Sequence, residues 1–226
     1  MLRVGLTGNL GSGKSTVASL FEKRGAHVLQ SDAIGRELMQ PGKPVFDAIV
    51  ALFGPGVLQP DGTLDRPALA RIAFAEGHAK ELNAIVHPAV IARQGELAEA
   101  IEAQNPSAVL LVESALLFDP KHPSRDPRAG RFARILLVTA SEDDKLERFL
   151  RRTGSAADRP EVRKAEARRR LALQVSDEVA VPLADHVIRN DGSLGGLERQ
   201  VEALWPILAD AARVPELLQD STESLQ

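Results

Sequence analysis

The sequence has 226 residues but no cysteine, and it contains no long run of apolar residues. Without cysteine, a disulfide scaffold, a thiolate metal site and a cysteine nucleophile are all excluded. A membrane-spanning helix needs about 20 consecutive apolar residues, and the opening MLRVGLTGN shows no charged leader before an apolar stretch. We therefore expect a protein that is neither secreted nor inserted in a membrane and that works in the reducing cytoplasm.

A strong charge of one sign is also missing. The chain carries 28 basic and 31 acidic residues, a formal net charge of -3. This balance gives no global attraction to nucleic acid, so any anion binding has to be local. Hydrophobic residues at 44% and charged residues at 26% are ordinary for a globular protein. The length favours one main domain, residues 1–226, that is large enough to contain an inserted subdomain; no feature predicts an oligomeric state.

Five short runs of aliphatic and β-branched residues are typical of strands. They are RVGLT at 3–7, HVLQS at 27–31, AVLLVES at 108–114, RILLVTA at 134–140 and DHVIRN at 185–190. Their apolar character is nearly continuous rather than alternating, which indicates strands buried on both faces of a parallel sheet. Parallel strands require helical crossovers, and helical patterns lie between the runs. The sequence thus predicts an α/β fold with a doubly wound, parallel, five-stranded sheet.

Two stretches are too long to be simple crossovers. Residues 32–106 contain four helical patterns separated by the turn signals QPGKP, FGPG and QPDGT, and we expect them to form a helical insertion. Residues 145–178, which begin within SEDDKLERFLRRTG, are expected to form a helical lid. SEDD itself predicts a helix cap followed by acidic residues in the first turn, where the helix dipole favours them. The polar end of the chain, residues 213–226, is expected to be frayed.

A glycine-rich segment, GLTGNLGSGKST at 5–16, follows the first predicted strand and precedes a helical pattern. Within it, residues 8–15, called the phosphate loop below, match G-x-x-x-x-G-K-[ST] completely. The glycines let backbone N–H groups point inward at phosphate oxygens, and the helix start adds partial positive charge. The pattern predicts a nucleoside triphosphate site on a P-loop nucleoside triphosphate hydrolase-like fold. The alternative, a glycine-rich turn with a solvated lysine, explains the spacing and the flanking elements less well.

The residues of the phosphate loop are predicted to have distinct roles. Lys14 would place a full positive charge at the β- and γ-phosphates of ATP, and the Ser15 hydroxyl would bind Mg²⁺. The full set of predicted nucleotide contacts here is Gly8, Gly11, Ser12, Gly13, Lys14, Ser15 and Thr16. A loop of this kind predicts the phosphoryl donor but does not identify the acceptor.

Two carboxylates fall at the ends of predicted strands, where doubly wound sheets bind their ligands. Asp32 follows the second strand; it can accept a hydrogen bond from an acceptor hydroxyl and align that hydroxyl with the γ-phosphoryl group. Alternatively, Asp32 caps the helix AIGREL. Glu113 ends the most apolar strand, where an unpaired carboxylate is unfavourable. It either faces Mg²⁺, through water or against a partner cation, or belongs to an ordinary ion pair.

Basic residues concentrate between positions 148 and 170, where nine of them stand against three acidic residues. The basic residues are Arg148, Arg151, Arg152, Arg159, Arg163, Lys164, Arg168, Arg169 and Arg170. A lid that closes over a triphosphate needs arginines, because planar guanidinium groups suit phosphate. Two alternatives stay open. The four-residue spacing of Glu166 and Arg170 points to a solvated helix face, and a nucleic-acid patch is disfavoured because aromatic residues for base stacking are nearly absent.

The sequence also resembles the dephospho-coenzyme A kinase family, whose fold is similar to that of the nucleotide monophosphate kinases. The resemblance runs along most of the chain and rests on GLTGNLGSGKSTV, SDAIGRELMQPGKP, LFGPGVLQPDGTLDR, IVHPAVI, ESALLFD, RRRLALQ and ADHVIRNDGSL. The phosphate loop is shared by many families. The SDAIGR stretch, the DGTLDR turn and the HP pair in this order are much more particular.

The resemblance implies ATP-dependent phosphorylation of the ribose 3′-hydroxyl of dephospho-coenzyme A, which gives coenzyme A and ADP. It further implies that Asp32 contacts the acceptor hydroxyl and that Arg36 and His87 belong to the substrate site. The insertion at 32–106 would then bind the coenzyme. His87 also has a plain alternative: a partly buried histidine that precedes a proline and holds a helix end.

The same resemblance extends to the nucleotide side of the site. Arg152 and Arg170 match lid positions of the family, so that both join Lys14 and Asp32 as predicted catalytic residues. Asn190 and Gly192 would lie near the adenine of ATP. The chain departs from the family pattern inside the phosphate loop, where it carries NL at 9–10 and the family usually has Gly-Ile.

Two other functions compete with this interpretation. One is a different kinase of the same architecture that acts on a nucleoside or a nucleotide. The other is a P-loop switch or ATPase that uses hydrolysis to move a partner; its GTPase version is disfavoured because the chain lacks an N-K-x-D motif. An ATPase predicts rapid hydrolysis without an acceptor, whereas a kinase excludes water until its lid closes.

Overall fold

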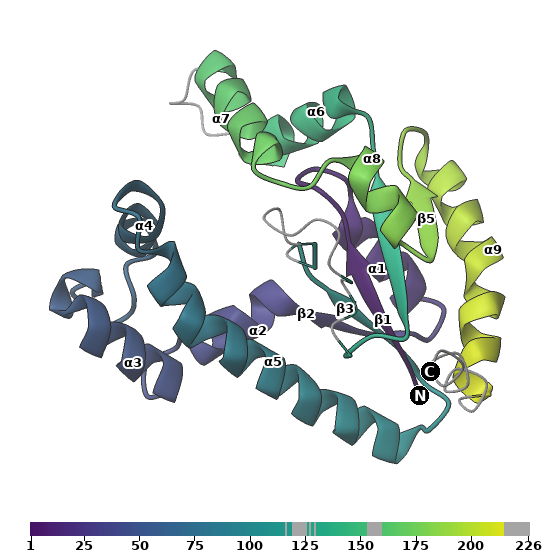
Figure 1. Cartoon of the computed structure of the whole chain (residues 1–226), viewed down its shortest axis with the longest axis horizontal. Helices are drawn as coiled ribbons and strands as arrows, with labels where there is room; N and C mark the ends of the chain where they lie inside the picture. The colour runs from purple at the N-terminus through teal and green to yellow at the C-terminus, as the bar shows by residue number, and fades with distance from the viewer. Residues whose placement is uncertain (116, 119–125, 127, 129, 153–159, 215–226) are drawn as a thin grey trace, which may run out of the picture. The chain divides into compact units, whose positions relative to one another are not determined.

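The computed structural model describes residues 1–115, 117–118, 126, 128, 130–152 and 160–214. Contacts between Cα atoms divide the chain into two units. The first, the sheet unit, comprises Met1–Leu29 together with Ile101–Gln226, and the second, the helical unit, comprises Gln30–Ala100. Figure 1 labels the α-helices and strands of both units. The helical unit overlaps the stretch 32–106 that was expected to form an insertion.

Five strands form one sheet in the order β2-β3-β1-β4-β5 (Figure 1). They are β1 (Leu2–Thr7), β2 (His27–Gln30), β3 (Val109–Glu113), β4 (Arg134–Thr139) and β5 (His186–Arg189). β1 pairs in parallel with β3 and with β4, and β4 pairs in parallel with β5. The five predicted strands and the doubly wound α/β fold are therefore confirmed. Because β1 is central, the phosphate loop that follows it lies in the middle of the carboxyl edge of the sheet.

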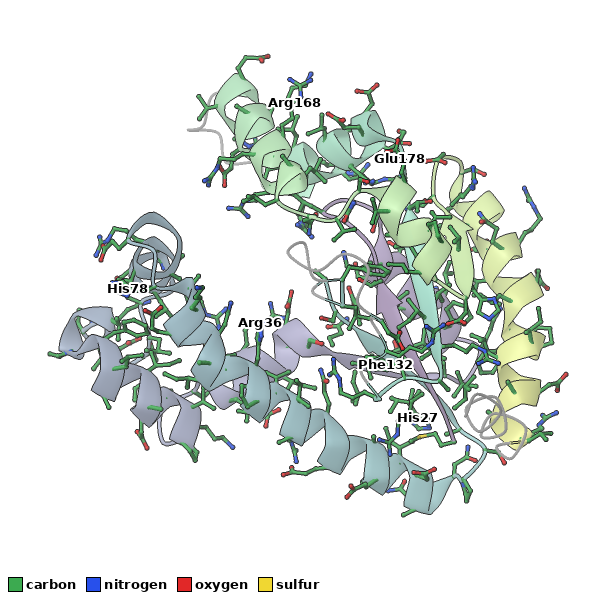
Figure 2. All side chains as sticks on the ribbon, in the orientation of Figure 1. His27, Arg36, His78, Phe132, Arg168 and Glu178 are labelled. Atoms are coloured by element: carbon green, nitrogen blue, oxygen red, sulfur yellow. The ribbon has the colours of Figure 1, made fainter. Side chains whose placement is uncertain are left out.

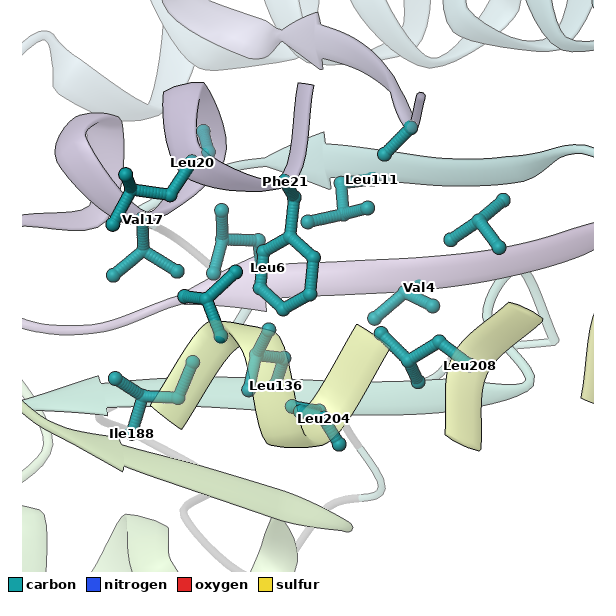
Figure 3. Packing of buried hydrophobic residues seen from close by; sticks show 14 of the residues in the cluster. Val4, Leu6, Val17, Leu20, Phe21, Leu111, Leu136, Ile188, Leu204 and Leu208 are labelled. Carbon is teal, nitrogen blue, oxygen red and sulfur yellow. The ribbon is translucent and has the colours of Figure 1, made fainter. Parts of the chain in front are cut away.

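Helices α1 (Lys14–Glu22) and α9 (Leu194–Arg213) pack on the sheet and on each other. Figure 3 shows Phe21 of α1 and Leu208 of α9 among the buried side chains of the strands. Leu6 of β1 and Leu136 of β4 are fully buried in the same cluster. Each such side chain stabilises the fold by about 1.5–3 kcal/mol when it leaves water. This packing fixes the strand before the phosphate loop and the helix after it.

Strand β4, which lies between β1 and β5, is buried on both of its faces. Leu136 points into the cluster under α1 and α9, and the next residue, Leu137, points to the opposite face, as the two-residue period of a strand demands. There Leu137 contacts Val175 and Ala180, the last residue of α8 (Asp177–Ala180). Burial on both faces explains why the sequence of β4 is continuously apolar.

Two helices of the sheet unit, α6 (Glu142–Arg152) and α7 (Pro160–Ala172), carry the described basic residues between positions 148 and 170. α6 begins after Ser141, whose Oγ accepts a hydrogen bond from the Asp144 N–H at 3.1 Å. Acidic residues occupy its first turn, so the cap predicted from SEDD is confirmed. α7 packs against α6 through a cluster of Leu146, Phe149 and Ala167. Within the predicted lid at 145–178, residues 153–159 lie outside the described residues, as do 215–226 of the end expected to fray.

The helical unit is built from short helices and most of the long helix α5 around a core of its own. Its elements are α2 (Ser31–Leu38), α3 (Pro44–Phe53), the 3-10 turn η1 (Pro55–Val57), α4 (Arg66–Ala70), the π-helical turn η2 (Arg71–Ala75) and most of α5 (Ala79–Gln104). The buried side chains at its centre are Val45, Ile49, Val57, Leu64 and Leu69. A second 3-10 turn, η3 (Val181–Leu183), belongs to the sheet unit.

Element boundaries differ from the predicted ones at three places. The AIGREL helix begins at Ser31, two residues earlier than its pattern suggests. The pattern RPALARIAFA divides into α4 and a π turn, in which the Glu76 N–H reaches back to the Arg71 carbonyl oxygen. α5 continues through Pro88, although proline lacks the N–H that an interior helix position donates. No described helix combines the length and the apolar composition that crossing a membrane demands.

Candidate functional site: a phosphate loop and its supports

The phosphate loop connects β1 to α1, beginning with Gly8 directly after the strand. Gly13 is the N-cap of α1 and adopts the left-handed conformation, with φ 94° and ψ 24°. A Cβ at this position would lie 2.2 Å from Asn190 Nδ2, so a side chain is excluded by both strain and space. Gly11 has φ 75°, and its Cβ would lie 2.3 Å from the Lys145 carbonyl oxygen. Glycine is therefore required here by the turn and by the elements behind it.

Lys14 is the first residue of α1 and reaches back over the loop. Its Nζ donates hydrogen bonds to the Gly8 carbonyl oxygen at 2.7 Å and to the Asn9 carbonyl oxygen at 3.2 Å. Ser15 and Thr16 follow in the first turn and are exposed. The first N–H groups of a helix have no partner within it and carry partial positive charge. Lys14 therefore adds a full charge to a site already suited to an anion.

Ser12 forms the buried wall of the loop. Its side chain is fully buried, and its Oγ has no hydrogen-bond partner among the described residues. Its carbonyl oxygen accepts a hydrogen bond from Asn190 Nδ2 at 2.8 Å. A glycine-rich loop that leads into a helix start and holds a buried hydroxyl without a partner among the described residues fits a bound oxyanion, so these residues fit the triphosphate of a nucleotide.

Asn190 and Gly192 follow β5, the last strand of the sheet. The Asn190 backbone N–H donates to the Thr139 carbonyl oxygen at 2.8 Å, which continues the ladder between β5 and β4. Its side-chain amide donates to the Ser12 carbonyl oxygen, so Asn190 supports the phosphate loop directly. Gly192 is exposed, and a Cβ there would meet no atom within 4 Å. Nothing in the local backbone requires glycine at 192.

Glu113 is the last residue of β3 and lies beside Leu6 of β1 in the parallel register. Leu6 lies two positions before the first residue of the phosphate loop, so this half-buried carboxylate belongs to the same edge of the sheet. Among the described residues, no group of three or more His, Asp or Glu side chains could hold a metal ion. A cation near Ser15 and Glu113 would thus need oxygens from the nucleotide and from water, as Mg²⁺ usually does.

The predicted acceptor residues lie in the helical unit. Asp32 is the second residue of α2 and is exposed. The N-cap of this helix is Gln30, without a side-chain hydrogen bond, so the interpretation of Asp32 as a cap is wrong. The reason is that Ser31 already belongs to the helix; its Oγ accepts a hydrogen bond from the buried Gln94 of α5 at 2.9 Å. Arg36, labelled in Figure 2, is exposed in the last turn of α2.

His87 lies in the interior of α5 and is exposed. The alternative of a partly buried histidine that holds a helix end is therefore wrong on both counts. It fails because Pro88 does not end the helix, which continues to Gln104. His87 and Asp32 belong to the same unit, and both side chains are exposed and therefore accessible to a ligand.

The two predicted lid arginines have different surroundings. Arg152 is the last residue of α6 and is exposed. Arg170 Nε donates to Glu166 Oε1 at 2.7 Å, and its guanidinium lies 5.8 Å from the centre of the Phe149 ring. Arg169 donates to the same carboxylate, and the hydrogen bonds from Arg169 and Arg170 lower the pKa of Glu166 to about 2. The predicted spacing of Glu166 and Arg170 thus forms an ion pair, and neighbouring Arg168 also projects from α7 (Figure 2).

Further side chains support the phosphate loop from behind and were not predicted. The Leu10 N–H donates to Gln174 Oε1 at 2.8 Å, and Asn9 Nδ2 donates to Asp177 Oδ1 at 3.0 Å. Arg148 donates to the Asn190 carbonyl oxygen at 2.7 Å. Arg148 had been counted only as one of nine basic residues. Lys145, Arg148 and Phe149 are three and four positions apart along α6, so they lie on one face of the helix. This spacing is the signal that could have distinguished the packed face of α6 from its solvent-exposed face.

Comparisons with known proteins give a consistent result. The sequence profile of the dephospho-CoA kinase family matches residues 2–195. The dephospho-CoA kinase of Moorella thermoacetica is 38% identical over 91% of this chain and 91% of its own length. That of Streptomyces avermitilis is 39% identical over 95% of this chain and 98% of its own length. That of Geobacter metallireducens is 41% identical over 91% and 96%, respectively.

Solved structures agree with these sequence matches. TT1252 from Thermus thermophilus is 32% identical and superposes with a TM-score of 0.72, covering 92% of this chain and 97% of its own. The dephospho-CoA kinase from Campylobacter jejuni has a TM-score of 0.59 at 19% identity, with coverage of 92% and 97%. The second likeness supports the fold alone.

Proposed function

The chain belongs to the dephospho-CoA kinase family, and on that premise we propose that it transfers the γ-phosphoryl group of ATP to the ribose 3′-hydroxyl of dephospho-coenzyme A, the final step of coenzyme A synthesis. The products are coenzyme A and ADP. The single observation that carries the proposal is the phosphate loop at the end of β1, within a chain that matches the family over residues 2–195. The residue roles below extend it.

The phosphate loop binds the triphosphate. Backbone N–H groups of Gly8, Gly11 and Gly13, with those at the start of α1, would surround phosphate oxygens. Ser12 would contribute its buried hydroxyl, because its own N–H donates to the Asn9 carbonyl oxygen at 3.1 Å. The proposed role of Lys14 at the phosphates is supported by its position next to the loop, where its ammonium group contacts two loop carbonyl oxygens. When ATP binds, the same ammonium group turns to the β- and γ-phosphates and stabilises negative charge that develops during transfer. Thr16 adds a hydroxyl in the exposed first turn of α1.

Ser15 and Glu113, together with the nucleotide, would hold Mg²⁺. Both side chains lie at the carboxyl edge of the sheet, one after β1 and one at the end of β3. A bound Mg²⁺ ion would neutralise phosphate charge and orient the triphosphate for transfer. The hydroxyl of Ser15 would be a direct ligand, and Glu113 would act through water.

Asp32 orients the acceptor. Its exposed carboxylate, in the first turn of α2, accepts a hydrogen bond from the ribose hydroxyl and aligns it for attack. Because the transition state of phosphoryl transfer is loose, alignment contributes more than complete removal of the proton. Arg36 and His87, also exposed in the helical unit, contact the coenzyme. The unit Gln30–Ala100 is thus the acceptor-binding part of the chain.

The remaining nucleotide contacts come from the sheet unit. Arg152 and Arg170 supply guanidinium groups to the transferring phosphoryl group. Arg170 gives up its hydrogen bond to Glu166 when it binds phosphate. Asn190 and Gly192 line the adenine side, where the exposed Gly192 leaves room for a flat ring. Segment 145–178 acts as the lid that keeps water from the triphosphate until the acceptor is bound.

The test is a panel of phosphate acceptors offered with ATP and Mg²⁺. We expect phosphate to be gained by dephospho-coenzyme A and not by a nucleoside or a nucleoside monophosphate, with the mass of the product as the readout and NMR locating the phosphate on the 3′-oxygen. Preferential phosphorylation of a nucleotide would favour the related kinase instead. Rapid ATP hydrolysis without any acceptor would favour the ATPase. Undiminished activity in excess chelator would contradict the Mg²⁺ assignment.

A further inference from the structure

A buried ion pair lies directly behind the phosphate loop. Lys145 Nζ of α6 is 2.6 Å from Asp177 Oδ2, the first residue of α8. The Lys145 side chain is only 8% exposed, so its charge is almost entirely removed from water. Replacing such a pair by apolar residues is often neutral or stabilising, so stability alone is a weak reason for its presence. Neither residue has a role in the proposed phosphoryl transfer.

The other oxygen of Asp177 reaches the phosphate loop itself. Asn9 Nδ2 donates to Asp177 Oδ1 at 3.0 Å and to the Val175 carbonyl oxygen at 3.0 Å. Asp177 therefore joins a lysine of α6 to a side chain of the loop through its two oxygens. Asn9 lies between Gly8 and Gly11, in the part of the loop with the least intrinsic stiffness.

The two residues that follow Asn9 are held by the same elements. The Leu10 N–H donates to Gln174 Oε1 at 2.8 Å, and the Leu10 side chain packs against the α6–α7 cluster. Gly11 lies so close to the Lys145 backbone that a Cβ would come within 2.3 Å of its carbonyl oxygen. Three successive loop residues thus contact both ends of segment 145–178, near Lys145 and near Asp177.

We propose that Asn9, Lys145 and Asp177 are positioning residues that hold the phosphate loop in its nucleotide-binding conformation and anchor both ends of segment 145–178 to it. The proposal rests on the proposed function, because it assigns them to the ATP side of that reaction. A glycine-rich loop loses conformational entropy when its N–H groups converge on phosphate. A tether that orders the loop beforehand removes this cost from binding, which raises the affinity for ATP.

The experiment compares tether variants by the dissociation constant of a nonhydrolysable ATP analogue with Mg²⁺, measured by calorimetry. The tether consists of the Asn9–Asp177 hydrogen bond and the Asp177–Lys145 ion pair. Asn9→Ala removes the side chain that the loop contributes to it. The double variant Lys145→Met/Asp177→Ala removes both members of the ion pair, so it leaves no unpaired buried charge. We expect each to raise the dissociation constant by about three- to tenfold, the scale of one or two lost hydrogen bonds. KM for dephospho-coenzyme A should stay within about twofold, because the tether lies on the nucleotide side.

Two further variants make the outcome specific. If Asn9 acts through Asp177, the triple variant should bind the analogue about as weakly as the weaker parent rather than showing additive losses. Glu142→Gln is the control, because it breaks another ion pair between α6 and α7, Glu142–Arg168 at 3.7 Å, whose two side chains are exposed to solvent and have no hydrogen bond to the loop among the described contacts. This control should leave the dissociation constant unchanged.

A purely structural tie gives a different pattern. Lower melting temperatures with unchanged analogue binding, or additive losses in the triple variant, would overturn the proposal. Failure of the proposed function is seen separately: a wild-type chain that binds the analogue but does not phosphorylate dephospho-coenzyme A refutes the function and leaves the tether measurable. A wild-type chain that does not bind the analogue refutes both.

Discussion

Asn190 donates its side-chain amide to the carbonyl oxygen of Ser12 at 2.8 Å, although the two residues are 178 positions apart. The bond joins the end of β5 to the buried wall of the phosphate loop. It also explains the glycine next to Ser12, since a Cβ at Gly13 would collide with the same amide. The loop is therefore shaped from outside as well as by its own glycines.

Asn190→Asp tests this contact with little change in size. The variant places a carboxylate where the amide donated, so the Ser12 carbonyl oxygen loses its partner, at a cost of about 1–3 kcal/mol. We expect a lower melting temperature and weaker ATP binding by calorimetry. Asn105→Asp is the control, because Asn105 Oδ1 accepts from the Ser107 N–H and aspartate retains that bond. Equal behaviour of the two variants would contradict the role of Asn190.

Gly11→Ala and Gly192→Ala separate a glycine required by the backbone from one that is not. At Gly11, with φ 75°, the new Cβ would lie 2.3 Å from a carbonyl oxygen, so we expect lower stability and a loss of ATP binding. At Gly192 the Cβ meets open space, so the fold should be unaffected and only a direct contact with the nucleotide could change its affinity. Thermal melting and nucleotide titration of both variants measure this. An unchanged affinity in Gly192→Ala would remove Gly192 from the predicted nucleotide contacts.

Lys14→Ala should lower kcat by orders of magnitude, because it removes a charged donor at the transferring group. Stability should change less than activity, since the side chain is partly solvated and its ammonium group bonds to carbonyl oxygens of the loop. Lys23→Ala, just beyond the same helix, is the control with an exposed lysine. Steady-state kinetics with saturating ATP measure the difference. Near-normal turnover in Lys14→Ala would refute the role.

His186 predicts a pH dependence of stability. Burial lowers the pKa of this imidazole; Asp185 opposes the effect and Arg134 adds to it. The unfolded chain therefore binds the proton more readily, so this contribution to stability is complete above the ordinary pKa of about 6.5 and is lost as the pH falls below it. The melting temperature of the wild type should fall more steeply than that of His186→Gln between neutral and mildly acidic pH. Parallel curves would show that His186 is not responsible.

The central sheet and the phosphate loop could be predicted because their signals are local in the sequence. Strand β4 is continuously apolar since both of its faces are buried, and a run of that kind is visible without knowing its partners. The phosphate loop needs glycines at fixed spacing because N–H groups must approach an anion closely. In both cases one physical requirement acts on neighbouring residues.

The supports of the loop could not be predicted in this way. Asn9 and Asp177 are 168 positions apart, and each alone is an ordinary polar residue that no local sequence pattern distinguishes. The alternative of Asp32 as a helix cap is wrong for a similar reason, because the side chain of Gln94, 63 positions beyond Ser31, contacts the first residue of α2. The alternative of His87 at a helix end is wrong because α5 continues through Pro88, although proline usually interrupts helices.

Asp32→Asn addresses the acceptor side of the reaction. The amide keeps the size and exposure of the carboxylate but is a weaker acceptor for the ribose hydroxyl, so alignment suffers in the transition state. We expect kcat with dephospho-coenzyme A to fall by about 10²- to 10⁴-fold, while the affinity for ATP stays nearly unchanged because the nucleotide is bound by the phosphate loop. Asp47→Asn is the matched control, since Asp47 is likewise an exposed aspartate in the first turn of a helix, α3, of the same unit. Rates from single-turnover experiments and ATP affinity from calorimetry decide the matter. A selective loss of ATP binding in Asp32→Asn would place this carboxylate at the nucleotide instead. Equal rates in Asp32→Asn and Asp47→Asn would contradict the proposed role of Asp32 in orienting the acceptor, because the position of an exposed aspartate in the first turn of a helix would then have no catalytic consequence.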